Sequence, residues 1–167
     1  NQRDAGAQKQ QTWQAKLDAY HASDAVKAAE FERRMRGALA PDWSDAIDKF
    51  AKDQQANPVD LETRKSSQAA IGAIAQGVPE FFGGSADLTG SNNTRWGDAQ
   101  DEQYMSFGVR EFGMTAISNG MQLHGGYRPF TGTFLIFMEY ARNAVRLAAL
   151  MQLPNIFVYT HDSVAVG

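Results

Sequence analysis

The chain has 167 residues, near the common size of a single domain, so we expect one core and an accessory segment. Its 16 Lys and Arg and 19 Asp and Glu give a formal net charge of -3, and neither sign forms a long block that would attract nucleic acid or an anionic membrane. The lack of cysteine excludes disulfides, thiolate metal sites and a cysteine nucleophile. No apolar run approaches the roughly 20 residues that span a bilayer, so we expect a soluble, cytoplasmic protein.

Residues 1–60 predict a helical connecting arm. They are rich in Gln, Ala and charged residues, and their sparse apolar residues follow two helical stripes: Trp13, Leu17, Tyr20 and then Phe31, Met35, Leu39. Pro41 indicates a break before a further helix, capped by Asp42 or Ser44. Residues 54–58 are typical of a linker to a second unit, which we place at residues 61–167.

Residues 61–167 alternate between helical and strand-like patterns. A helix capped by Thr63 or Ser66 is predicted to run through residues 69–76 and end at Gly77. The remaining elements are predicted as a strand in 80–88, a polar loop at 89–103, a strand at 104–108, a helix at 110–124, a strand at 127–132, a helix at 134–151 and a strand at 155–160. This alternation predicts an α/β fold: a mostly parallel, doubly wound sheet with helices on both faces.

In such folds, ligands meet the loops at the carboxyl ends of the strands. Polar residues follow three of the predicted strands: Asp87 and Ser91, then Glu111, then His161. Each also has a purely structural explanation. Glu111 would complement the dipole at a helix start, His161 would donate to a carbonyl group, and Asp87 and Ser91 would form turns.

Aromatic residues gather where the last long helix is predicted to begin. Phe134, Phe137 and Tyr140 stand there, and stripes of this kind are more often core than ligand platforms. Their place at the same predicted sheet edge as Glu111 favours a planar ligand stacked on a ring beside a carboxyl group. The sequence has no GxSxG elbow, no P-loop and no metal-ligand spacing, so we predict no metal ligand in this chain.

Five motifs, in this order, closely resemble transketolase, and specifically its middle, pyrimidine-binding domain: ETRKSSQ, GGSADLTGSN, FGVREFGM, PFTGTFLIFMEYARNAVRLAALM and VYTHDSVAVG. The preceding EFERRMRGALAPDW resembles the helical connection before that domain. The resemblance implies the thiamine-diphosphate-binding fold of the pyrimidine type. It also implies an enzyme of the pentose phosphate pathway that moves a two-carbon ketol unit from a ketose phosphate to an aldose phosphate.

The resemblance also implies roles for individual residues. Glu111 would hydrogen-bond the N1′ atom of the cofactor's aminopyrimidine and favour its imino tautomer. Phe137 would stack on that ring, Phe134 and Tyr140 would complete the pocket, and Asp87 would lie close to the cofactor. A carboxyl group does this only if it holds or shares its proton in a dry setting.

Three further residues match positions that hold the sugar phosphate: Arg64, Ser91 and His161. A bidentate cation, a hydroxyl and an imidazole suit phosphate oxygens. The chain departs from the family at Ala165, where transketolases commonly have Gly.

Part of the expected site is missing from this sequence. In the family, the diphosphate and its Mg or Ca ion are held by a separate domain with a GDG motif, and the cofactor lies between the subunits of a homodimer. Because the chain begins with Asn1 and ends at Gly167 after a strand-like run, we expect a piece of a longer polypeptide, inactive on its own. Two alternatives stay open: a related enzyme, such as a dihydroxyacetone synthase or a deoxyxylulose phosphate synthase, and a non-catalytic docking or assembly module.

Overall fold

The computed structural model describes residues 1–162. The first 60 residues form three helices: α1 (Gln2–Ser23), α2 (Ala25–Met35) and α3 (Asp45–Ala56). The rest forms α4 (Thr63–Gly77), β1 (Phe81–Ser85), α5 (Thr89–Asn92), the 3-10 turn η1 (Asp101–Gln103), β2 (Tyr104–Ser106), α6 (Glu111–His124), β3 (Arg128–Phe134), the 3-10 turn η2 (Leu135–Phe137), α7 (Met138–Leu150) and β4 (Ile156–Thr160).

The four strands form one sheet in the order β2-β1-β3-β4, and every neighbouring pair is parallel. Ser85 lies opposite both Ser106 and Gly132, and Phe134 lies opposite Thr160. The carboxyl ends of the strands therefore meet at one edge of the sheet. The predicted α/β class is confirmed, and the described sheet is wholly parallel.

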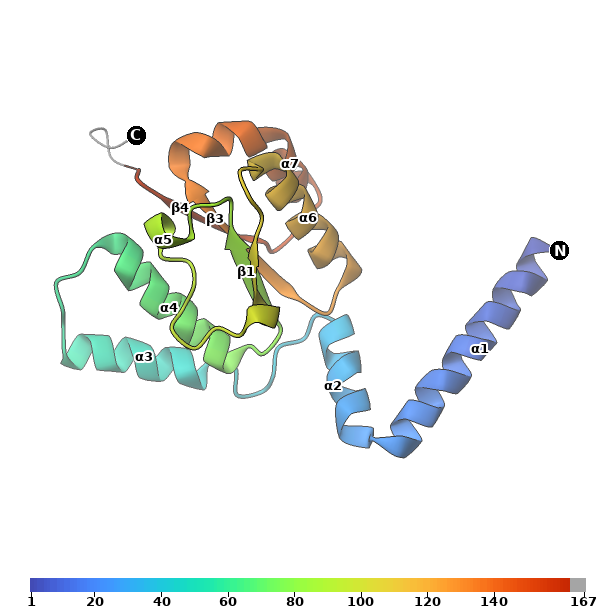
Figure 1. Cartoon of the computed structure of the whole chain (residues 1–167). Coiled ribbons are helices and arrows are strands. Elements are labelled where there is room, and N and C mark those ends of the chain that lie inside the picture. The colour runs from blue at the N-terminus through green and yellow to red at the C-terminus, as the bar shows by residue number, and fades with distance from the viewer. Residues whose placement is uncertain (163–167) are drawn as a thin grey trace.

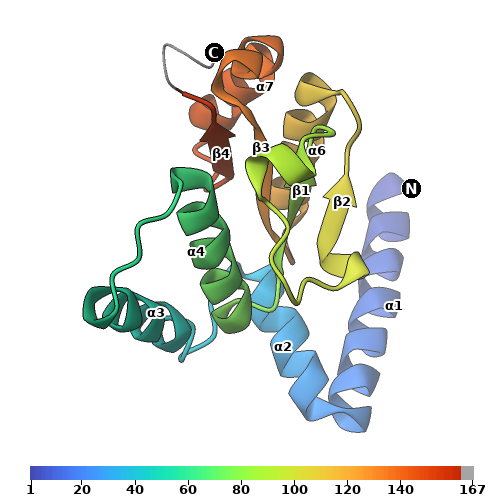
Figure 2. The same cartoon turned by 60° about the vertical axis from the view of Figure 1, so that its left-hand side comes forward.

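Helices cover both faces of this sheet (Figures 1 and 2). On one face, Ile71 of α4 packs into a buried cluster with Phe81 of β1, Phe130 of β3 and Trp96. The rings of Phe81 and Phe130 are stacked, with centroids 4.7 Å apart. On the other face, α6 and α7 lie side by side. The prediction of a doubly wound sheet is confirmed.

The arm joins the sheet through α2 and α3. Ala28 of α2 is fully buried, and α3 packs against α4. In contrast, α1 buries none of its residues, and Figure 1 shows it standing away from the sheet. The three helices predicted for the arm are confirmed, whereas the boundary between an arm and a domain at residue 60 stays a prediction.

Several predicted element ends were wrong. Glu62 holds the N-cap position of α4, so neither Thr63 nor Ser66 caps it. Ser44 does precede α3, but its side chain makes no capping hydrogen bond. The helix α3 continues to Ala56, which shortens the predicted linker at its start.

The last long helix also begins later than predicted. Phe134 still belongs to β3, because it pairs with Thr160 in the parallel ladder. The 3-10 turn η2 follows, and α7 starts only at Met138. The apolar run across this junction has no period that separates a buried strand from a buried helix.

Among residues 1–162, we find no helix with both the length and the apolar character that crossing a bilayer requires.

Candidate functional site

The predicted site residues fall at the carboxyl edge of the sheet. Asp87 lies two residues beyond β1, Glu111 opens α6 after β2, Phe134 ends β3, and His161 directly follows β4. Parallel strands deliver these loops to the same edge, which is where such folds bind ligands. The structure thus brings together, on one edge, residues that lie up to 74 positions apart in the sequence.

Glu111 is the first residue of α6 and is only 8% exposed. Phe107, which precedes α6, and Met114, on the first turns of α6, form a small buried cluster with Ala86. Within residues 1–162, the carboxylate of Glu111 makes no hydrogen bond, and its oxygens are not among the fully enclosed atoms that lack a partner, so they retain access to solvent. Phe112, the next residue along α6, is 51% exposed.

Four rings form a continuous row beside β3 and β4. The Phe134 and Phe137 rings stack with centroids 5.4 Å apart and an interplanar angle of 14°. His161 lies against Phe134 at 3.9 Å, and Tyr140 adjoins Phe137 at 6.0 Å. Tyr140 is 69% exposed, so it closes no pocket within this chain. The row offers ring faces to a planar ligand.

Arg64 and Ser91 are brought together from different elements. Nη1 of Arg64, on α4, donates to the carbonyl oxygen of Ser91, on α5, at 3.1 Å. Glu62 lies 3.5 Å from Nε of Arg64 and offsets part of its charge. Arg64 is held at the carboxyl edge with its side chain only partly exposed.

Other predicted residues stay apart. Asp87 is exposed, adopts a left-handed φ of 61°, and makes no hydrogen bond with any residue in 1–162. In the same described part of the chain, no hydrogen bond joins Glu111 to the ring row. His161 also has a left-handed φ, of 55°. Ser163 and Ala165 lie outside the described residues.

The sequence reasoning missed a buried polar chain at this edge. Ser85 and Asn92 are both fully buried, and Oγ of Ser85 donates to Oδ1 of Asn92 at 3.0 Å. The amide of Asn92 donates to the hydroxyl of Thr160, which lies 2.9 Å from Nδ1 of His161. In the sequence, Asn92 lies in a polar segment rich in turn-forming residues after β1, so nothing in its residue type distinguishes it from its neighbours. Only the 68-residue reach to Thr160 reveals its role, and no local pattern carries that signal.

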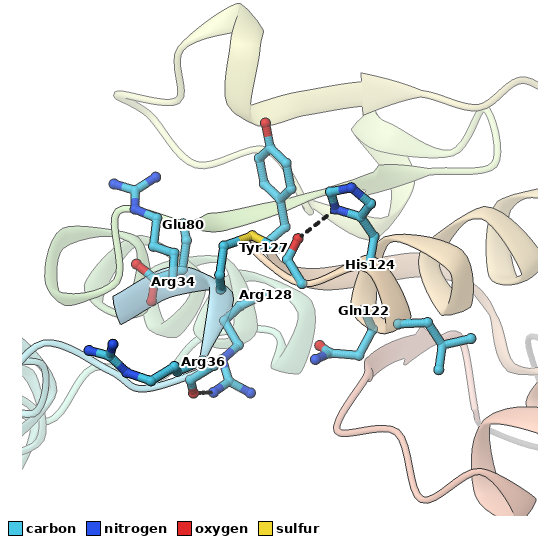
Figure 3. A pocket seen from close by; sticks show the side chains of 12 residues that line it. Arg34, Arg36, Glu80, Gln122, His124, Tyr127 and Arg128 are labelled. Carbon is cyan, nitrogen blue, oxygen red and sulfur yellow. Dashed lines mark hydrogen bonds between the residues drawn. The ribbon is translucent and has the colours of Figure 1, made fainter. Parts of the chain in front are cut away.

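A separate cavity of about 220 Å³ opens at the opposite edge of the sheet, where the arm meets the domain (Figure 3). Arg34, Arg36 and Arg128 line it, with Glu80 at its wall. These charges have partners inside the chain. Arg34 pairs with Glu30 at 2.6 Å, Arg36 with Glu32 at 3.5 Å, and Arg128 donates to the carbonyl oxygen of Gly37. The cavity is therefore a junction between the arm and the domain, remote from the predicted site.

The fold and the site geometry indicate a class of protein. A parallel α/β domain that presents a buried acid and a row of rings at the carboxyl edge of its sheet is a ligand-binding domain of the doubly wound type. Residues 59–167 match the family described as "Transketolase, pyrimidine binding domain". The chain belongs to the transketolase family.

Relatives along the whole chain agree with this assignment. Transketolase 1 of Vibrio parahaemolyticus is 51% identical over 170 residues, which cover 98% of this chain and 26% of the relative. Transketolase 1 of Vibrio cholerae is 50% identical, with the same coverage. The chain therefore spans about a quarter of the length of the curated relatives it matches.

Solved structures are similar over the same extent. A transketolase from Leishmania mexicana superposes with a TM-score of 0.80 at 39% identity, over 98% of this chain and 25% of that one. A Pichia stipitis transketolase in complex with sedoheptulose-7-phosphate gives a TM-score of 0.82 at 37% identity, over 100% of this chain and 26% of that one. The likeness includes the arm as well as the sheet, because it extends over almost all of the chain.

Proposed function

We propose that the polypeptide containing this chain is a thiamine-diphosphate-dependent transketolase and that this chain supplies the aminopyrimidine half of its site. The observation that carries the proposal is the position of Glu111, a mostly buried residue whose carboxylate makes no hydrogen bond within residues 1–162, at the edge that also bears the ring row. When bound, thiamine diphosphate would supply the carbon nucleophile and the electron sink for moving a two-carbon ketol unit.

The residues of this chain fit the aminopyrimidine. Within residues 1–162, the Glu111 carboxylate lacks a hydrogen-bond donor, and the N1′ position of that ring would provide one when protonated. Glu111 keeps a small accessible surface, at 8% exposure, so a ligand is able to reach it. Its role would be to hold or share a proton with N1′ and so to select the ring's tautomer.

The aromatic residues would orient the ring. Phe137 is held by stacking against Phe134 and by the turn η2, so its face is positioned before any ligand arrives. Phe134 and Tyr140 would flank it, and Asp87 would lie near the cofactor. A positioned ring lowers the entropy lost when a planar ligand binds.

The substrate proposal is a ketose phosphate as donor and an aldose phosphate as acceptor. Arg64, Ser91 and His161 would bind the phosphate or hydroxyl oxygens, as their donor groups allow. Pichia stipitis transketolase has been solved in complex with fructose-6-phosphate and with sedoheptulose-7-phosphate, which supports this substrate class over pyruvate or formaldehyde. Side-by-side assays of sugar phosphates, pyruvate and formaldehyde would separate transketolase from its two enzyme alternatives.

The proposal includes a homodimer with the cofactor at the subunit interface. Exposed apolar side chains on and near β2 and α6 support it: Met105, Val109, Phe112, Ile117 and Leu123. The diphosphate and its Mg or Ca ion would be held by a domain outside this chain. Among residues 1–162, no three His, Asp or Glu side chains gather as a metal site would need. We further propose a cytoplasmic enzyme of the pentose phosphate pathway.

The test is Glu111→Gln in the full-length polypeptide, at saturating thiamine diphosphate and metal. The amide keeps the shape of the side chain but no longer exchanges a proton, so we expect turnover to fall by about 100-fold or more. Glu139→Gln is the matched control, because Glu139 is an exposed acid in the first turn of α7. Wild-type turnover in Glu111→Gln would contradict the assignment.

The docking-module alternative has its own test. Calorimetry on residues 1–167 alone should show no tight, metal-dependent binding of thiamine diphosphate, whereas the full-length polypeptide should bind it. If the full-length polypeptide fails to bind the cofactor, the module interpretation replaces the enzyme.

A further inference from the structure

Ser85, Asn92, Thr160 and His161 are joined in a series of hydrogen bonds, and the donor-to-acceptor direction of this series can be deduced. Its first link is unambiguous, because the backbone N–H of Leu88 is a donor only, and it donates to Oγ of Ser85 at 3.1 Å. Ser85 is fully buried, and within residues 1–162 the one acceptor for its own proton is Oδ1 of Asn92. A buried hydroxyl proton without an acceptor is costly, so the oxygen of the Asn92 amide must face Ser85.

The same logic carries the direction across the sheet. With its oxygen toward Ser85, Asn92 turns its NH₂ group toward Thr160 and donates to the Thr160 hydroxyl. Thr160 is 8% exposed and has one proton left to give. Nδ1 of His161, 2.9 Å away, is its acceptor within the described part of the chain. Donation by Thr160 requires that Nδ1 carry no proton, so this arrangement places the proton of a neutral His161 on Nε2.

We propose that Asn92 and Thr160 are positioning residues that hold His161 as the Nε2–H tautomer, with its ring fixed against Phe134, so that Nε2 presents a hydrogen-bond donor to a substrate oxygen. The inference rests on the proposed function only for that last step. Direction and tautomer follow from the chain's own contacts. The Phe134 ring supplies the second constraint on the imidazole, because the two ring centroids lie 3.9 Å apart, with the ring planes tilted by 33°.

The direct test is ¹⁵N NMR of the full-length polypeptide carrying imidazole-labelled histidine, with the His161 signals assigned by their loss in His161→Gln. At a pH where the ring is neutral, we expect a single tautomer with the proton on Nε2. A proton on Nδ1, or a mixture of tautomers, would overturn the proposal. This measurement needs no activity, so it stays decisive even if the polypeptide is not a transketolase.

Variants of Thr160 test whether its hydroxyl group fixes the tautomer of His161. Thr160→Val removes the hydroxyl at nearly constant shape, and we expect a tautomer mixture to return. Thr160→Ser keeps the hydroxyl and should keep the single tautomer. Thr133→Val is the matched control, because Thr133 is also buried on the neighbouring strand but its hydroxyl has no partner in the described structure. A mixture of His161 tautomers in the control, or a single tautomer in Thr160→Val, would contradict this role of Thr160.

Kinetics then tests whether the positioning reaches the substrate. Thr160→Val should raise KM for the sugar phosphate by about 3-fold to 10-fold with little change in kcat, which is less than loss of the whole imidazole donor should cost. In a His161→Ala background the same substitution should have no further effect on KM, because Thr160 would act only through His161. Additive effects would assign Thr160 a structural role and reject the positioning role.

Discussion

The most informative stability prediction concerns Glu80, the buried carboxylate where the arm meets the sheet. It is 3% exposed and pairs with both terminal nitrogens of Arg33, at 2.8 and 2.9 Å. Replacing Glu80 with Gln would leave a largely buried guanidinium without this partner, and breaking a buried pair in this way costs about 3–5 kcal/mol. Arg33 still donates two hydrogen bonds to Glu30, so we expect the lower end, about 3 kcal/mol.

Glu30→Gln is the matched control, since it makes the same chemical change to the same arginine. The Glu30 side chain is 38% exposed, and exposed pairs contribute about 1 kcal/mol or less. In urea unfolding followed by circular dichroism, we expect Glu80→Gln to lower the midpoint by about 1–2 M and the control by less than half of that. Equal shifts in the two variants would refute the reasoning, because burial would then not set the cost.

Three further predictions follow from the structure. Hydrogen bonds from Arg33 and Arg34 lower the pKa of Glu30 from 4.5 to about 2, so the stabilisation that Glu30 contributes is complete above about pH 4.5 and is lost as the pH falls toward 2. When the free energy of unfolding is measured against pH, Glu30→Gln should make this loss in acid smaller. An unchanged slope would contradict the prediction. Gly84→Ala would place a Cβ 1.8 Å from a backbone carbonyl oxygen of β2, so thermal melts should show a loss of at least about 3 kcal/mol, against under about 0.5 kcal/mol for Gly90→Ala, where the new atom meets nothing within 4 Å. Phe112→Asp should leave the fold intact but shift the proposed homodimer of the full-length polypeptide toward monomers in sedimentation equilibrium, and an unaltered oligomeric state would remove the support that these exposed side chains give to the proposal.

Acid stability at the junction has a second contributor. Burial pushes the pKa of Glu80 upward, but hydrogen bonds and charge from Arg33 outweigh this effect, and the net pKa is lowered. Its stabilisation is therefore also present at neutral pH and lost in acid. The stabilisation contributed by Glu30 and that contributed by Glu80 should therefore both be lost as the pH falls.

The period of the sequence predicts the layers of this fold well, because burial on one side of a helix or both sides of a strand leaves a local signature. The helix pattern at residues 110–124 and the continuous apolar run at 155–160 were both confirmed, as α6 and β4. The start of α7 was wrong because the run from Phe134 to Phe137 is apolar throughout. Its division into strand and turn depends on pairing with Thr160, which lies on another strand.

The candidate site divides in a similar way. The places of Glu111, Phe137 and His161 at the carboxyl edge follow from the order of strands and helices, which a sequence carries. The hydrogen bonds from Ser85 through Asn92 to Thr160 cannot be predicted in this way, because they form only when β1, α5 and β4 come together in the folded structure. The roles assigned to the predicted site residues stay predictions.

The wholly parallel sheet has a consequence for how the chain folds while it is being made. β1 lies between β2 and β3, and no strand of the described sheet pairs with its neighbour through a hairpin. At about 5–20 residues per second, a ribosome needs roughly 2–8 s to add the roughly 40 residues between Ser85 and Arg128, so β1 must wait for its larger partner. During that interval Phe81 lacks the ring of Phe130 that covers it in the native sheet. Nascent chains halted before residue 128 should therefore bind chaperones or aggregate, whereas chains released after β4 should not.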